Sequence, residues 1–198
     1  MTRAVVFNVV QLGEFPATRS KARDGRNRLE DILAGKTGVD LTIDFTGVTA
    51  MTISFADEFL GKFLTSLDAT SQELTLKVTG LNTENAEAVT ICLERREAQV
   101  AVLDSDGILK LDGAPPLPET FDTAVELGEF KANDLAQRLN ISPQNANNRL
   151  KRLAAVGALR KTRTIGASRG GKEFSYATVT ARVPDTDGLS MEVPLTHS

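Results

Sequence analysis

The amino-acid sequence predicts an α/β domain followed by a smaller α+β domain. In the first half of the 198-residue chain, strand-like segments alternate with segments of helical period. A stretch rich in Pro and Gly then interrupts both patterns near residue 115. In the last third, two closely spaced helical patterns precede two strand-like segments. We therefore place the first domain at residues 1–111, a proline-rich linker at 112–118, the second domain at 119–180 and a mobile tail at 181–198.

The first domain should contain a sheet with covering helices. Its strand patterns lie at residues 4–10, 39–45 and 74–79, and a helical pattern follows each of them. The helix in the second of these intervals has the clearest start, because Ser54 precedes the acid Asp57 by three residues and could cap the helix. Residues 84–97 should form the third helix, and 100–103 with 108–111 a terminal hairpin. The order of strands in the sheet stays open.

The second domain shows the order helix, turn, helix, hairpin. Residues 131–139 have one apolar helical face, and a second helix should begin at about Pro143, since Ser142 can cap it and proline suits the first helical position. Gly157 should end that helix. Strand-like segments at 158–165 and 172–179 then form a hairpin. This order is typical of a winged helix-turn-helix, which places its second helix in a DNA groove.

The charge distribution also favours DNA. Residues 141–180 hold eight Lys or Arg against one acid, a balance of +7, whereas residues 1–118 have a balance of −5 and the whole chain −3. A basic segment in an acidic protein localises the attraction for a polyanion, although the hairpin could instead be an ordinary solvated one. The side chains expected to contact DNA are Ser142, Gln144, Asn145, Asn147, Asn148, Lys151, Arg152, Arg160, Lys161, Arg163, Arg169 and Lys172.

Two segments resemble the winged helix-turn-helix domains of bacterial transcription regulators. They are Asp-Leu-Ala-Gln-Arg-Leu-Asn-Ile-Ser-Pro at 134–143 and Leu-Lys-Arg-Leu-Ala-Ala-Val-Gly-Ala-Leu at 150–159. The resemblance covers about the last third of the chain. It implies that the second helix reads bases and that the wing touches the DNA backbone, while some members of this class bind only proteins.

Residues 41–59 resemble a STAS-like domain, the fold of the anti-anti-sigma factors. Asp44 at a strand end and Gly47-Val48 in the following loop match the family motif, and Ser54 falls where that family carries a phosphorylatable serine. Three positions depart from the motif, namely Thr52, Ile53 and Phe55. The resemblance spans roughly residues 1–111 and implies a possible phospho-switch at Ser54, beside the plain helix-cap reading. Related bacterial domains occur near serine-kinase-like ATPases.

Several classes of function are disfavoured. The single cysteine, Cys92, lies in an apolar stretch and reads as a core residue, and the only histidine is His197. We expect neither an enzyme nor a metal or cofactor site, since P-loop and dinucleotide glycine motifs are also missing. Asp44 and Asp57 have structural explanations at a strand end and a helix start. The basic run at residues 19–28 reads as a solvated helix face or as a second anion-binding surface.

These observations predict a cytoplasmic bacterial transcription regulator with double-stranded DNA as its partner. Its STAS-like domain would provide dimerisation or receive a signal, and a homodimer is expected because paired half-sites double the contacts. No membrane-spanning segment is expected. The alternative is a partner-switching adaptor, in which the STAS-like domain binds a serine-kinase-like ATPase and the winged helix docks a protein.

Overall fold

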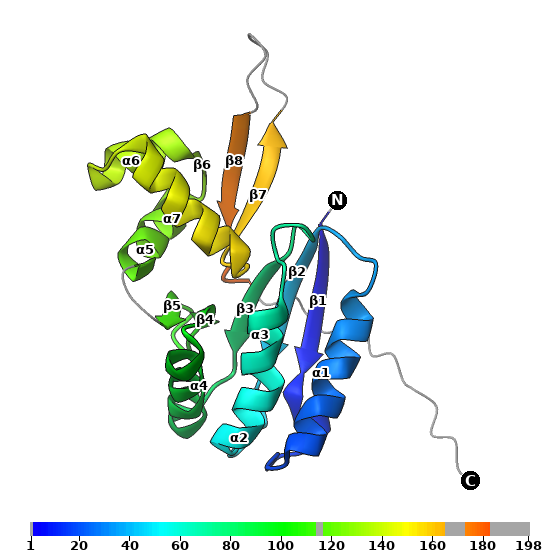
Figure 1. The fold of residues 1–198 in the computed structure, drawn as a ribbon. Coiled ribbons are helices and arrows are strands. Elements are labelled where there is room, and N and C mark those ends of the chain that lie inside the picture. The colour runs from blue at the N-terminus through cyan, green and yellow to red at the C-terminus, as the bar shows by residue number, and fades with distance from the viewer. Residues whose placement is uncertain (1, 114–116, 165–172, 183–198) are drawn as a thin grey trace.

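The computed structural model of this chain describes residues 2–113, 117–164 and 173–182. In these ranges the chain forms a five-stranded sheet with covering helices, followed by a helical unit with a three-stranded sheet (Figure 1). The predicted alternation of strands and helices in the first part is therefore present. Residues 183–198 of the expected tail lie outside the described ranges.

The five-stranded sheet follows the order of the chain. Its strands are β1 (Arg3–Asn8), β2 (Val39–Asp44), β3 (Thr75–Thr79), β4 (Gln99–Leu103) and β5 (Leu109–Gly113). The first four run parallel in the order β1-β2-β3-β4, and β5 pairs antiparallel with β4 as the predicted terminal hairpin. The structure thus supplies the strand order that the sequence left open.

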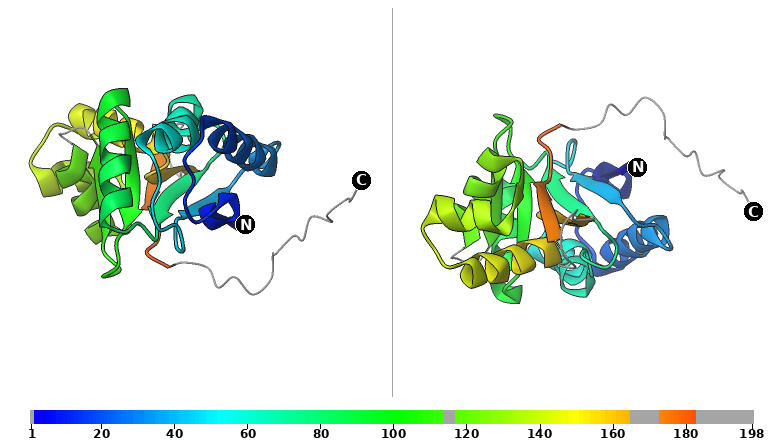
Figure 2. Two further views of the ribbon diagram at one scale, coloured as in Figure 1. Left: turned by 90° about the horizontal axis from the view of Figure 1, so that it is seen from below. Right: turned by 90° about the horizontal axis from the view of Figure 1, so that it is seen from above.

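One face of this sheet carries all the long helices of the first part. They are η1 (Val9–Leu12), α1 (Arg19–Leu33), α2 (Ile53–Ala56), η2 (Asp57–Gly61), α3 (Lys62–Ser66) and α4 (Thr83–Arg96). Each crossover advances one strand in the same direction, so the usual right-handed connection puts α1, α3 and α4 on a common face (Figure 2). The core beneath them is aromatic, with Phe7, Phe45 and Phe55 each within 6.4 Å of the Phe59 ring, centroid to centroid.

The helix after β2 begins two residues earlier than predicted. Thr52, not Ser54, is the N-cap, because its Oγ1 accepts a hydrogen bond from the Phe55 amide at 3.1 Å. The same hydroxyl donates to the Ala17 carbonyl at 2.9 Å, a contact 35 residues away in the chain. Ser54 therefore lies inside the first turn and is exposed. The expected capping role of Ser54 is wrong.

The second part contains every helix and strand expected of it. Its elements are α5 (Leu117–Leu127), β6 (Glu129–Lys131), α6 (Ala132–Leu139), α7 (Pro143–Ala155), β7 (Leu159–Thr164) and β8 (Glu173–Thr178). The strands form an antiparallel sheet in the order β6-β8-β7. Phe130 and Tyr176 stack across it with ring centroids 6.0 Å apart. In Figure 1, β7 and β8 extend away from the five-stranded sheet.

The two parts share a hydrophobic core. Ala101 and Leu103 of β4, with Leu109 and Leu111 of β5, cluster with Phe121 of α5. The second part therefore covers the face of β4 and β5 that the other helices leave free. The predicted linker at 112–118 is too long, since β5 runs to Gly113 and α5 begins at Leu117.

Candidate nucleic-acid interface

Helices α6 and α7 are joined by a tight turn with capped ends. The Asp134 carboxylate accepts the Lys131 amide at 2.8 Å where α6 begins, and Asn140 adopts the left-handed conformation (φ 52°) where it ends. Ser142 Oγ then accepts the Asn145 amide at 3.2 Å, and Pro143 takes the first position of α7. The start of α7 predicted from Ser142 and Pro143 is confirmed.

One face of α7 is buried and the opposite face is bare. Ala146, Leu150 and Leu153 are completely buried against α5 and α6. The outer face is exposed along the whole helix, and within the described ranges four of its side chains make no hydrogen bond or ion pair: Gln144, Asn148, Lys151 and Arg152. These four side chains, which we call the α7 strip, are free to meet a ligand.

The other predicted contact residues of α7 have partners inside the helix. Asn145 Oδ1 accepts a hydrogen bond from Arg149 Nε at 3.1 Å, and Asn147 Nδ2 donates to the Pro143 carbonyl at 3.0 Å. Ser142 is the cap described above. All three are exposed at the N-terminal end of α7, so they lie beside the α7 strip without belonging to its unpaired set.

Strand β7 adds two cations near this surface. Arg163 is exposed and has no partner in the part of the chain that the structure describes. Lys161 Nζ lies 4.0 Å from the centroid of the Phe174 ring, a cation–π contact. The predicted contacts at Arg169 and Lys172 lie outside the described residues.

Arg160 does not join these cations, because its guanidinium holds the two parts of the protein together. It donates to Asp40 Oδ1 at 2.6 Å, to Thr2 Oγ1 at 2.9 Å, and to the carbonyls of Glu73 and Val39 at 3.1 and 3.3 Å. Its side chain is only 17% exposed. Contact with a DNA phosphate would require breaking all of these bonds, so the structure places Arg160 in an interdomain contact.

Two more contacts reinforce this junction. The Gly157 carbonyl accepts the Leu76 amide at 2.8 Å, so the turn after α7 extends the hydrogen bonding of β3 at its open start. Lys77 Nζ donates to the carbonyls of Thr180 and Arg182 at 2.7 and 2.6 Å. Burial lowers the pKa of Lys77, and the nearby Asp40 carboxylate opposes part of that shift. Sequence reasoning missed this junction, because nothing local marks residues more than 80 positions apart as partners.

A second exposed feature lies at the carboxyl ends of β1 and β2. The Glu14 carbonyl accepts the Thr49 amide at 2.8 Å, and Asn85, which is completely buried, donates from Nδ2 to the Val48 carbonyl at 2.9 Å. These bonds fix the loop that leads into α2 and exposed Ser54. Phe15, next to Glu14, is 64% exposed. An exposed aromatic ring therefore accompanies the predicted phospho-switch.

The basic run on α1 is partly neutralised. Glu58 is only 4% exposed and lies 3.6, 3.5 and 2.6 Å from nitrogens of Arg23, Arg26 and Lys62. The hydrogen bond from Lys62 keeps the pKa of Glu58 below its ordinary value in spite of burial. For Arg23 and Arg26 the helix-face interpretation therefore has a specific partner in the buried acid.

Both aspartates considered for acid–base chemistry have structural partners. Asp44 Oδ1 accepts the Thr46 amide at 2.8 Å, and Asp57 forms a two-point pair with Arg96 at 2.6 and 2.9 Å. The bond from Arg96 lowers the pKa of Asp57. Burial, and then the charge of Asp57, raises the pKa of the buried Cys92 thiol to about 11. Across the described residues no three His, Cys, Asp or Glu side chains gather as a metal site, and no helix could span a membrane.

Comparison with known proteins bears on the first part only. Residues 26–86 match the family model described as a STAS-like domain of unknown function (DUF4325). The match runs from within α1, through β2, the helix after it and β3, into α4. No curated protein matches the chain. The parallel sheet and its helices are consistent with that fold, and the match supports a STAS-like identity for residues 26–86.

Proposed function

We propose that this protein is a sequence-specific DNA-binding transcription regulator. The observation that carries the proposal is the α7 strip, a row of amide and cationic side chains that is exposed and unpaired within the described residues. Asn and Gln can pair in bidentate fashion with adenine, and Lys and Arg can contact guanine or phosphate. A helix that spends its best DNA-reading groups on solvent is suited to a groove.

The surrounding architecture supports the same proposal. The order α5, β6, α6, α7, β7, β8, with β6 pairing on β8, is the order of a winged helix-turn-helix. In that class α7 would be the recognition helix and the hairpin the wing. Lys161 and Arg163 would then approach the phosphates, while Arg160 is removed from the proposed DNA surface.

The test compares two charge-matched double variants. Lys151→Ala with Arg152→Ala removes two cations from the α7 strip, and Arg28→Ala with Arg95→Ala removes two exposed cations from α1 and α4. DNA affinity is measured by fluorescence anisotropy at several salt concentrations. We expect only the first variant to lose affinity and to flatten the salt dependence by about 0.9 log units per lost phosphate contact. Equal behaviour of the two variants would contradict the proposal.

We further propose that the STAS-like part acts as the input or dimerisation module. Support comes from the shared core of β4, β5 and α5 and from the contacts of Arg160, which couple the two parts mechanically. A change in the first part can therefore reach the base of α7. Homodimer formation is measured by analytical ultracentrifugation of the full chain, with and without operator DNA.

A partner-switching adaptor is the second candidate, favoured by one specific observation. Exposed Ser54 and exposed Phe15 lie on segments that hydrogen-bond to each other at one end of the sheet, which gives a protein partner both a modifiable hydroxyl and an apolar anchor. Capture of a serine-kinase-like ATPase that is lost in Phe15→Ser, together with salt-insensitive or absent DNA binding, would favour this candidate over the regulator.

A further inference from the structure

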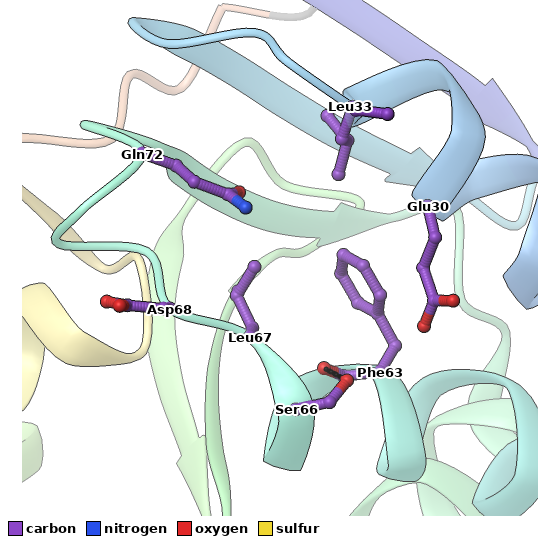
Figure 3. Close-up of a pocket in the computed structure, with 8 residues that line it drawn as sticks. Glu30, Leu33, Phe63, Ser66, Leu67, Asp68 and Gln72 are labelled. Atoms are coloured by element: carbon purple, nitrogen blue, oxygen red, sulfur yellow. Dashed lines mark hydrogen bonds between the residues drawn. The ribbon is translucent and has the colours of Figure 1, made fainter.

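A cavity of about 310 Å³ lies between the C-terminal ends of α1 and α3 and the loop that precedes β3 (Figure 3). Its size falls at the lower end of the range for small-molecule sites. It is on the far side of the loop from the second part of the protein and contains none of the residues of the α7 strip. The STAS-like match and the DNA proposal leave it without a role.

The walls of the cavity are apolar. Leu33 of α1, Phe63 of α3 and Leu67 contribute their side chains to it, and Figure 3 shows the Phe63 ring directed into the space between the two helices. Leu33 and Phe63 belong to the main core, so the cavity opens directly onto packed hydrocarbon. A ligand here would gain most of its binding free energy by burying an apolar body.

The polar groups of the cavity are mainly acceptors. Gln72 points its amide into the space, and its Oε1 is buried without a hydrogen-bond partner in the described structure. A buried oxygen in that state favours a ligand that donates a hydrogen bond. Glu30 lies across the opening, half exposed, with only a long 3.8 Å contact to Arg26.

The net charge at the rim is negative. Asp68 also borders the cavity, and the hydrogen bonds from Ser71 hold the pKa of Asp68 below its ordinary value, so it stays ionised at neutral pH. The described lining residues include two acids and no Lys or Arg. A cation is therefore preferred over an anion of the same shape.

From these observations we propose that the cavity binds a small organic cation, a protonated amine attached to an apolar body. The apolar body lies against Leu33, Phe63 and Leu67. The ammonium donates to Gln72 Oε1 and faces the Glu30 carboxylate.

The site is also well placed to influence the second part. The residue after Gln72 is Glu73, whose carbonyl accepts the Arg160 guanidinium, and Ala69 of the same loop lies beside Gly157. A ligand that orders this loop would act on the junction described above. Any effect on DNA affinity rests on the proposed function, whereas binding of the amine does not.

The test uses three probes of similar shape and different charge: phenethylamine, 2-phenylethanol and phenylacetate. Each is titrated at neutral pH into the ¹⁵N-labelled full chain and followed by NMR. We expect phenethylamine to saturate in the millimolar range, with the largest shifts at the Gln72 side-chain amide and at residues 30–34 and 63–72. Phenylacetate should bind at least about tenfold more weakly. Equal affinity for the two ions, or shifts centred elsewhere, would overturn the proposal.

Variants locate the binding groups. Glu30→Gln and Gln72→Leu should each weaken phenethylamine binding about tenfold, as the loss of one charged or buried hydrogen-bond partner predicts. Glu94→Gln on α4 is the control and should change nothing, because Glu94 is exposed and distant in the fold. Thermal unfolding of each variant verifies that it is folded. Unchanged affinity in both folded cavity variants would refute the site, regardless of whether the protein binds DNA.

Discussion

Replacing Arg160 with Met should destabilise the protein and leave the salt dependence of DNA binding intact. The wild-type guanidinium makes four hydrogen bonds, one of them to a carboxylate, and is 17% exposed. Breaking a well-buried ion pair costs about 3–5 kcal/mol, but Asp40 is 42% exposed and can recover water. We therefore expect a loss of about 2–4 kcal/mol in the free energy of unfolding.

Urea unfolding followed by circular dichroism measures this loss. Arg163→Met is the matched control, because Arg163 precedes the same hairpin tip, is exposed and has no described partner. The control should stay within about 0.5 kcal/mol of wild type. A double-mutant cycle with Asp40→Asn should give a coupling energy of about 1 kcal/mol or more. If Arg160→Met matched the control in stability and also flattened the salt dependence of DNA binding, the interdomain assignment of Arg160 would be refuted.

Three further predictions concern the first part. Thr52→Ala should cost about 1 kcal/mol of stability by urea titration, whereas Ser54→Ala should cost far less, and the reverse order would contradict the observed cap. Cys92 should resist a thiol reagent at neutral pH until the protein is unfolded, because burial raises its pKa to about 11; rapid labelling of the native protein would disprove this. Since the folded-state pKa of Lys77 is below the ordinary 10.5, the folded protein binds fewer protons than the unfolded chain in that range, so wild-type stability should rise relative to Lys77→Met as the pH approaches 10.5. A flat or falling difference between the two urea midpoints would contradict the direction of that shift.

Local signals in the sequence were sufficient where a structure depends on neighbours in the chain. Ser142 followed by Pro143 located the start of α7 because cap and first turn are decided within four residues. The apolar stripe of α7 likewise predicted which side chains are buried. The amides and cations left over on the opposite face became the α7 strip.

Features that depend on distant partners were not predictable. Thr52 and Ser54 both carry a capping hydroxyl, and the choice falls on Thr52, which also reaches the Ala17 carbonyl 35 residues away. Arg160 looked like one more cation of a basic hairpin until the fold placed Asp40 beside it. The helix after β2 also contains the π-helical turn η2, where Asp57 pairs with Arg96 of α4, and no spacing in the sequence indicates that turn.

The boundary between the two parts shows the same limit. Three prolines in 111–119 indicated a linker, and a chain break in regular structure does occur there. The sequence could not reveal that α5 packs on β4 and β5, because alternating apolar residues in a strand do not indicate which element covers each face. The protein is therefore more closely coupled internally than a linker alone suggests.

Selection of genomic DNA fragments by the purified protein tests the central claim most directly. The wild-type chain and the Lys151→Ala, Arg152→Ala double variant are each incubated with fragmented DNA from the source organism at near-physiological salt, and the retained DNA is sequenced. The regulator proposal predicts that the wild type enriches a few sites sharing a short motif and that the variant loses this enrichment. Uniform recovery by both proteins, or recovery by neither, would contradict sequence-specific DNA binding through α7.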